Sequence, residues 1–276
     1  IRCAPSSRTR SYVMAGAFAW LAAPLLKTHM WKRIVVLAAV QGLGARMLGM
    51  GRRDNMLMAG SKLEGSKVTL RNAGKRFAAS LNNGGDVNVH AFITASERFV
   101  EDVERFGAFT ERGVNDARKN LKRVKQASEG RVSSMRALLR IELQRGARRP
   151  EGGPTSSSGA EALLWSRLGI SLWVELFKER LRARQGSLAD HFRNGFQHSL
   201  ARYFDRFGRA AFTMASRTAP DWDVVRQRTQ LGCDGGVCSD EALTSELKTF
   251  VRDVEPVLAR MTELQKSVGL EDLRTP

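Results

Sequence analysis

Three polar side chains with complementary hydrogen-bonding abilities follow one another at helical spacing: Asp116, Asn120 and Arg123. Positions i, i+4 and i+7 lie on one face of an α-helix. A carboxylate accepts hydrogen bonds, an amide both accepts and donates, and a guanidinium donates in a fork. Such a trio can hold a molecule that carries hydroxyl and amide groups. The competing interpretation is a charged face in water, because the whole segment Glu111–Lys125 is rich in charge.

A second candidate is Trp165, which stands near the start of a strongly apolar segment. Such a Trp usually packs in a core, but at the mouth of a pocket its flat face can stack on a sugar ring. No nucleophile elbow, metalloprotease helix or phosphate loop occurs in the sequence, and the 4 histidines lack the paired spacing of a zinc site. The sequence therefore favours a binding protein that is not an enzyme and needs no cofactor or metal.

The elements that must position these residues are predicted to be helices. Apolar residues recur at helical spacing from residue 88 onwards, first as a stripe that ends near Gly107, a plausible C-cap, and is made of Phe92, Ala95, Phe99, Val103 and Phe106. A second stripe runs from Val114 to Val124 and a third over Met135–Leu143. No strand pattern competes, so the predicted fold class is all-α.

Trp165 belongs to the most apolar of the predicted helices. Ser158 and Glu161 form a capping-box pattern at its start. Apolar residues surround the whole of Ala162–Phe177, which predicts a buried central helix. Gly169 costs about 1 kcal/mol relative to Ala inside a helix, and a close approach by a neighbouring backbone or by a ligand would explain it.

Two more helical regions follow. Ser187 and Asp190 mark a helix start, and behind them one apolar stripe contains Phe192, Phe196, Leu200, Tyr203 or Phe204, Phe207, Ala211 and Met214. The last helix runs over 243–264 and is predicted to kink at Pro256. Between these regions, Cys233 and Cys238 lie in a Gly-rich loop. They could form a disulfide in an oxidising compartment, but two free thiols are the favoured interpretation.

The net charge of +17 is concentrated at the N-terminus, since residues 1–84 hold 14 Lys and Arg against 2 Asp and Glu. The apolar runs Val13–Leu26 and Ile34–Val40 are shorter than the roughly 20 residues that span a bilayer. This region suits a targeting segment or an ordinary helical extension equally well. A basic surface attracts nucleic acid or anionic membrane. We expect a membrane surface rather than nucleic acid, because no platform for base stacking is evident.

Three blocks of the sequence, in this order, resemble the glycolipid transfer protein family over residues 85–275. The first is Asp116, Asn120 and Arg123, which match the family's Asp, Asn and Lys at the same spacing. The second, matching the family's Leu-Leu pair and Trp-Leu-Lys-Arg-Gly-Leu run, is Leu163-Leu164-Trp165-Ser166-Arg167-Leu168-Gly169-Ile170. The third block, Gly195–Pro220, aligns without gaps with a later family helix that ends in Ala-Pro.

This resemblance implies a two-layer helical sandwich over residues 85–276, preceded by the basic extension 1–84. The protein would carry one glycolipid or sphingolipid between membranes without chemistry, acting in the cytoplasm and at membrane surfaces. Asp116 would bind the lipid amide N–H, Asn120 and Arg123 would bind sugar hydroxyls, and Trp165 would stack beneath the first sugar. The hydrocarbon chains would lie in an apolar pocket lined by Phe92, Phe99, Leu164, Phe196, Phe204 and Phe207.

The chain also departs from the family pattern. The family His that binds the amide carbonyl falls on Phe204, at a cost of about 1 kcal/mol for one lost hydrogen bond. The Trp that touches the membrane falls on Arg206, and the second basic residue of the Trp-Leu-Lys-Arg run falls on Leu168. The family branch that binds phosphate headgroups usually replaces the stacking Trp with a basic residue and the Asn with Lys. Trp165 and Asn120 therefore favour a sugar.

Three alternatives remain at this stage. The first is transfer of a ceramide-1-phosphate-type lipid, with Arg118, Lys119 and Lys122 assisting Arg123. The second is a degenerate family member that senses lipid without transferring it. The third is a basic helical module that binds membranes or nucleic acid and holds no lipid. An open apolar pocket separates the lipid-binding alternatives from the third, which predicts a filled core.

Overall fold

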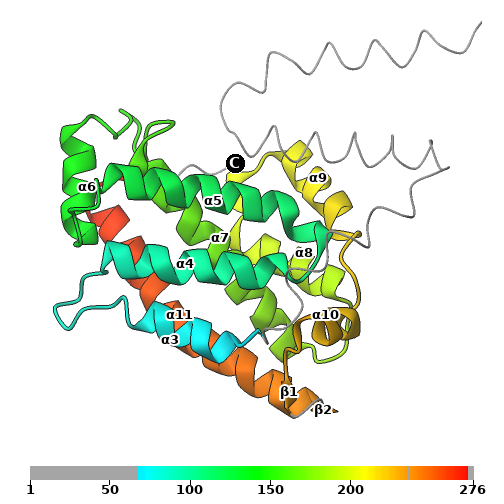
Figure 1. Cartoon of the computed structure of the whole chain (residues 1–276). Coiled ribbons are helices and arrows are strands. Elements are labelled where there is room, and N and C mark those ends of the chain that lie inside the picture. The colour runs from blue at the N-terminus through cyan, green and yellow to red at the C-terminus, as the bar shows by residue number, and fades with distance from the viewer. Residues whose placement is uncertain (1–67, 235–236, 273–276) are drawn as a thin grey trace, which may run out of the picture.

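The computed structural model describes residues 68–234 and 237–272 (Figure 1). The predictions about residues 1–67, including the targeting segment, lie outside the described residues. The described part is helical: α3 Leu70–Ala78, α4 Val89–Glu104, α5 Glu111–Ala127, α6 Met135–Gln144, α7 Gly159–Arg182, α8 Leu188–Ser199, α9 Arg206–Ser216, α10 Trp222–Thr229 and α11 Asp240–Ser267. None of these helices is long and apolar enough to cross a membrane.

The helices pack as two layers. In one layer α4 lies between α3 and α5, and in the other α7 lies between α11 and α8. The layers meet where α3 packs on α11 and where α5 packs on α7. The short helices α9 and α10 lie beside α8 at one end of the sandwich (Figure 1). The predicted all-α, two-layer fold class is confirmed.

The apolar stripes form the core between the layers. All five residues of the first predicted stripe, four in α4 and Phe106 just after it, are buried, and α7 is buried on nearly every side. The predicted helix starts are also confirmed: the Ser158 hydroxyl accepts from the Glu161 N–H at 3.0 Å, and the Ser187 hydroxyl accepts from the Asp190 N–H at 3.1 Å. The Glu161 carboxylate turns back one residue further than in a standard capping box and accepts from the Ser157 N–H at 2.7 Å.

The sequence boundary between residues 84 and 85 falls inside the folded unit. Helix α3 precedes that boundary, yet its Phe77 is fully buried. The Phe77 ring centroid lies 6.1 Å from that of Phe92, 5.9 Å from that of Phe99 and 6.4 Å from that of Phe250. Because these rings come from α4 and α11, the core needs α3, and the folded unit begins by residue 68.

The Phe77→Ala variant is therefore expected to lower the free energy of unfolding by about 3–5 kcal/mol, the usual cost of truncating a buried Phe. Chemical denaturation of the full chain measures this change. The control is Phe207→Ala, which removes the same atoms from a side chain that is 64% exposed and should change stability by less than about 0.5 kcal/mol. Equal losses in the two variants would show that α3 does not belong to the core.

The single apolar stripe predicted from Phe192 to Met214 is wrong. Helix α8 ends at Ser199, a 3₁₀ turn covers Ala201–Tyr203, and α9 begins at Arg206. The Asp205 carboxylate caps the new helix by accepting from the Gly208 N–H at 2.8 Å, and the chain changes direction there. Phe207 and Met214 consequently face solvent, 64% and 48% exposed.

The loop between α10 and α11 also differs from expectation. Cys233 and Cys238 form a disulfide, where free thiols were favoured. The bond joins β1, Cys233–Asp234, to β2, Val237–Cys238, in a two-stranded antiparallel hairpin, so one small sheet interrupts the helical pattern. The periodicity of apolar residues carries no signal for such a short hairpin. Helix α11 continues as one element through Pro256.

Candidate functional site

A cavity of about 140 Å³ lies between the two layers, close to α9. Its walls come from α4 and α5 on one side and from α7, α8 and α9 on the other. The lining is mostly apolar and consists of Ser96, Phe99, Val100, Val103, Phe109, Thr110, Arg112, Gly113, Val114, Ala117, Asn120, Leu121, Trp165, Ser166, Gly169, Ile170, Leu172, Trp173, Phe192, Phe212 and Ala215. The core of the described residues is therefore not completely filled.

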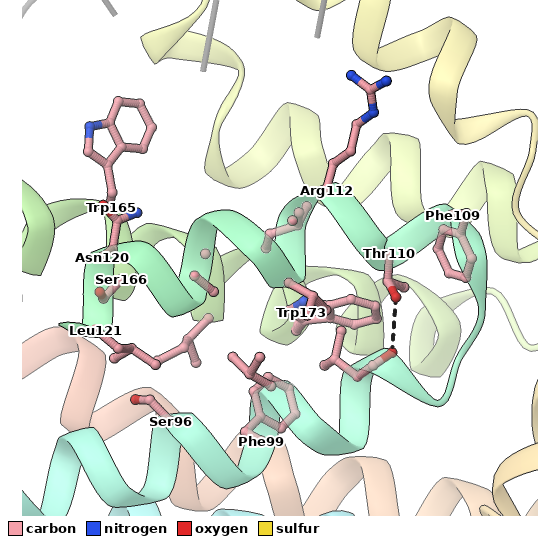
Figure 2. A pocket seen from close by; sticks show the side chains of 18 of the residues that line it. Ser96, Phe99, Phe109, Thr110, Arg112, Asn120, Leu121, Trp165, Ser166 and Trp173 are labelled. Atoms are coloured by element: carbon pink, nitrogen blue, oxygen red, sulfur yellow. Dashed lines mark hydrogen bonds between the residues drawn. The ribbon is translucent and has the colours of Figure 1, made fainter. Parts of the chain in front are cut away.

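The two ends of this cavity differ in chemistry. Figure 2 shows Asn120 and Ser166 next to Trp165 at one end, Phe109 at the other, where Thr110 and Arg112 lie at the edge, and Trp173 between them. At the aromatic end the ring centroid of Phe192 lies 5.7 Å from that of Phe109, 5.8 Å from that of Trp173 and 5.0 Å from that of Phe212. A molecule with a polar head and a hydrocarbon tail matches this division.

Asp116 and Asn120 lie one turn apart on α5 and are almost fully buried, 1% and 2% exposed. The interpretation of a charged face in water is therefore wrong for these two residues. The Oδ2 atom of Asp116 and the Oδ1 atom of Asn120 have no hydrogen-bond partner among the described residues. Buried polar atoms are nearly always paired, and both unpaired atoms here are acceptors, so the site lacks hydrogen-bond donors. Asn120 lines the cavity itself, whereas Asp116 lies beside it.

The environment of Asp116 opposes ionisation of its carboxyl group. Burial raises the pKa of Asp116 from 3.8 to about 6, although the nearby charge of Lys119 acts in the opposite direction. Removal from water disfavours the charged form of a carboxyl group. A ligand N–H that donates to this carboxylate would lower the pKa again.

Arg123 is occupied by contacts within the protein. Its Nη2 atom donates to the Ser158 carbonyl and to Glu161 Oε2, both at 3.1 Å. These bonds tie α5 to the beginning of α7, where Trp165 stands. Arg118, which the phosphate alternative invoked, donates to Glu104 at 2.9 and 2.6 Å.

Trp165 is partly exposed at the polar end of the cavity. Its ring meets Tyr203 and Phe204 edge-on, with centroids 6.0 and 6.3 Å apart. The structure thus brings Phe204, the residue at the position of the family His, next to the predicted stacking residue.

The structure places only one of the six predicted pocket residues, Phe99, in the lining of the cavity. The rest of that set is buried in packed core, namely Phe92, Leu164, Phe196 and Phe204, or exposed, namely Phe207. Sequence reasoning missed the aromatic residues Phe109, Trp173, Phe192 and Phe212. Their apolar spacing resembles that of any core residue, so no sequence signal separated them.

One signal was present at Gly169. A Cβ atom at Gly169 would meet nothing within 4 Å, and the residue lines the cavity. The presence of a glycine at position 169 is therefore not explained by the close approach of a neighbouring backbone. The glycine instead leaves open space in the middle of a buried helix.

Comparisons with known proteins agree with the helical fold. The family model of glycolipid transfer proteins matches residues 87–229, and no curated protein sequence matches the chain. The ligand-free mouse ceramide-1-phosphate transfer protein has a TM-score of 0.63 at 17% identity, over 76% of this chain and 100% of that one.

Two further solved structures carry different lipids in their names. The human ceramide-1-phosphate transfer protein, in complex with 12:0 ceramide-1-phosphate, has a TM-score of 0.64 at 18% identity, over 75% of this chain and 99% of that one. A fungal glycolipid transfer protein has a TM-score of 0.58 at 17% identity, over 72% of this chain and 97% of that one. Fold, sequence motifs and family model agree: this chain belongs to the glycolipid transfer protein family.

Proposed function

We propose that the protein binds one amide-containing glycolipid and carries it between membranes, making and breaking no covalent bond. The observation that carries this proposal is a pair of buried, unpaired acceptor oxygens one helical turn apart: that of Asn120, which lines the polar end of an apolar cavity, and that of Asp116, which lies beside it. An amide N–H would donate to Asp116, and a sugar hydroxyl would donate to Asn120. Trp165 would stack on the sugar at the mouth of the cavity.

The chemistry of this end supports a sugar rather than a phosphate headgroup. Sugar hydroxyls donate hydrogen bonds, which the two unpaired oxygens need. A phosphate group offers mainly acceptor oxygens, which cannot donate to the unpaired Oδ1 of Asn120, and negative charge, which repels an ionised Asp116. Arg123 and Arg118 of α5 are already held by Glu161 and Glu104, and Arg112, the arginine in the cavity lining, lies towards Phe109 at the opposite end (Figure 2).

Ceramide-1-phosphate remains the second candidate, because a solved relative of the same fold contains that lipid. Two exposed cations of α5, Lys119 and Lys122, could reach a phosphate group at the surface. We place this candidate second, since those cations lie outside the cavity lining.

The cavity must enlarge to hold a lipid. An engineered cavity of about 150 Å³ binds benzene, so about 140 Å³ holds only a small part of a hydrocarbon chain. The aromatic side chains at the apolar end, such as Phe192 and Phe212, would have to separate. Burial of the chains, at about 0.8 kcal/mol per CH₂ group, would drive this opening.

A vesicle transfer assay on the full chain tests the proposal. Donor vesicles would carry glycosylceramide, galactosyl-diacylglycerol, ceramide-1-phosphate or phosphatidylcholine, and mass spectrometry would identify bound lipid. We expect transfer of glycosylceramide above all, because it supplies both the amide N–H and the sugar. Preference for ceramide-1-phosphate would establish the second candidate. Binding without transfer would indicate a lipid sensor, and no binding of any lipid would refute the proposal.

The exposed face of α9 is the proposed contact with the membrane. Phe207 and Met214 are seven residues apart and therefore share one helical face, and the Arg206 guanidinium lies 4.8 Å from the centroid of the Phe207 ring. Apolar side chains flanked by Arg suit the boundary between anionic headgroups and acyl chains. This face would offer Phe207 in place of the family's Trp.

The Phe207→Ala/Met214→Ala double variant is expected to bind anionic vesicles at least tenfold more weakly, because burial of one such side chain contributes about 1.5–3 kcal/mol. Co-sedimentation with vesicles measures the change, and the transfer rate should fall with it. Val237→Ala is the matched control, since Val237 is 74% exposed but lies on the distant β hairpin. If the control weakened binding as much, the contact would not be specific to α9.

A further inference from the structure

Two buried serines stand in opposite walls of the cavity. Ser96 belongs to α4 and Ser166 to α7, and they are 2% and 6% exposed. Figure 2 shows both side chains among the apolar groups of the lining, with Ser166 beside Asn120 at the polar end. The position next to Trp165 puts Ser166 close to where the amide of a bound lipid would lie.

Both hydroxyl groups have already used their proton. Ser96 donates to the Phe92 carbonyl at 2.7 Å, and Ser166 donates to the Ala162 carbonyl at 2.8 Å. Each donation runs back to residue i−4 of the same helix. A hydroxyl oxygen keeps acceptor capacity after donating its one proton. Towards the cavity, these serines can therefore act only as acceptors.

Such serines suit a plain hydrocarbon chain poorly. At a buried helix position alanine has the higher helix propensity and presents a methyl group to the chain. A CH₂ group against the serine oxygen leaves its acceptor lone pairs unused, so a plain chain gains nothing from serine that alanine would not provide. A hydroxyl group on the lipid chain would supply the missing donor.

We infer that the cavity selects lipids that carry a hydroxyl group on a hydrocarbon chain close to the amide. This inference rests on the proposed function and deepens it by naming the substrate class. Two positions have the required chemistry: carbon 2 of the acyl chain and carbon 4 of the sphingoid base. The site would then offer acceptor oxygens to a ligand rich in hydrogen-bond donors. These oxygens belong to Asp116, Asn120, Ser96 and Ser166.

Competition binding to the full chain tests the inference with three galactosylceramides of equal chain length: one plain, one with a 2-hydroxyacyl chain and one with a 4-hydroxylated base. We expect at least one hydroxylated lipid to bind about fivefold more tightly than the plain lipid, which is the range of a single hydrogen bond. The hydroxylated lipid that binds more tightly shows which of the two hydrocarbon chains faces the serines. In the Ser96→Ala/Ser166→Ala variant the ratio should fall to about one.

Ser199→Ala is the matched control. Ser199 is also buried and donates to its i−4 carbonyl, that of Gly195, at 2.6 Å, but it does not line the cavity. This variant should keep the wild-type ratio. Equal binding of all three lipids by the wild-type protein would overturn the inference while leaving the proposed function intact, and binding of none would refute the proposed function instead.

Discussion

Replacing Asp116 with Val is expected to make the protein more stable and at the same time to weaken lipid binding about 10- to 150-fold. The buried carboxyl group has its pKa raised from 3.8 to about 6, and the difference corresponds to at most about 3 kcal/mol against folding at neutral pH. Valine removes that cost. It also removes the acceptor of the lipid N–H, and a hydrogen bond to a charged group contributes about 1.5–3 kcal/mol.

The dependence on pH follows from the direction of the shift. The folded protein holds this proton to a higher pH than the unfolded chain does. The buried Asp116 therefore costs no folding free energy below about pH 4, where it is protonated in both states. The stability present there is lost as the pH rises through about 6 and the carboxyl group ionises. Denaturation at several pH values should show the advantage of Asp116→Val growing over this window and staying constant above it. Lipid binding by the wild-type protein should strengthen over the same window, because an N–H donor favours the carboxylate.

Asp102 provides the matched control. It is also a buried carboxyl group, 8% exposed, and burial raises its pKa despite Arg98, Arg76 and Arg105 nearby. It lies on α4 outside the cavity lining. Asp102→Val should leave lipid affinity within twofold of wild type. If Asp116→Val also stayed within twofold, Asp116 would not be a headgroup ligand.

Filling the open space at Gly169 is expected to abolish lipid uptake. Gly169→Ala should raise the free energy of unfolding by about 1 kcal/mol, because Ala is the better helix former and its Cβ meets nothing within 4 Å. Gly169→Leu should place a larger side chain where the hydrocarbon chain must pass and reduce transfer at least a hundredfold. Vesicle transfer and thermal unfolding of the same samples measure both effects.

Gly195 in α8 tests whether the gain in stability at Gly169 comes from the open space around that glycine. A Cβ there would lie 2.7 Å from the Leu176 backbone nitrogen, so Gly195→Ala should destabilise the fold, opposite in sign to Gly169→Ala. Normal lipid transfer by a folded Gly169→Leu protein would show that the lipid lies elsewhere.

Much of the fold could be predicted because local chemistry determines it. The serines at positions 158 and 187 cap the helices that they were expected to cap, and the α4 stripe is buried as its spacing indicates. The break before α9 was missed because an apolar stripe can continue across a change in chain direction. The cap at Asp205 was its only local signal. Helix α3 was missed although Leu70, Ala73 and Phe77 have helical spacing, because the acid-poor sequence around them resembles the N-terminal extension.

In the candidate site, too, features set by local spacing were predictable and features set by packing were not. The positions of Asp116 and Asn120 on one helical face were predictable from spacing, but their burial was not, since it depends on α7 packing against α5. The cavity lining was mostly mispredicted. Whether an aromatic residue fills a core or borders a void depends on its neighbours from distant elements, as for Phe196, whose ring centroid lies only 3.9 Å from that of Phe212.

The packing of α3 against α11 has a consequence for synthesis of the protein. The Leu70 N–H donates to Glu246 Oε2 at 3.1 Å across a separation of 176 residues. At about 5–20 residues per second, translation of that interval takes about 10 to 35 s. During this time Phe77 lacks the α11 side of its core, so the nascent chain exposes apolar surface that a chaperone would recognise. The domain can close only when its last helix has left the ribosome.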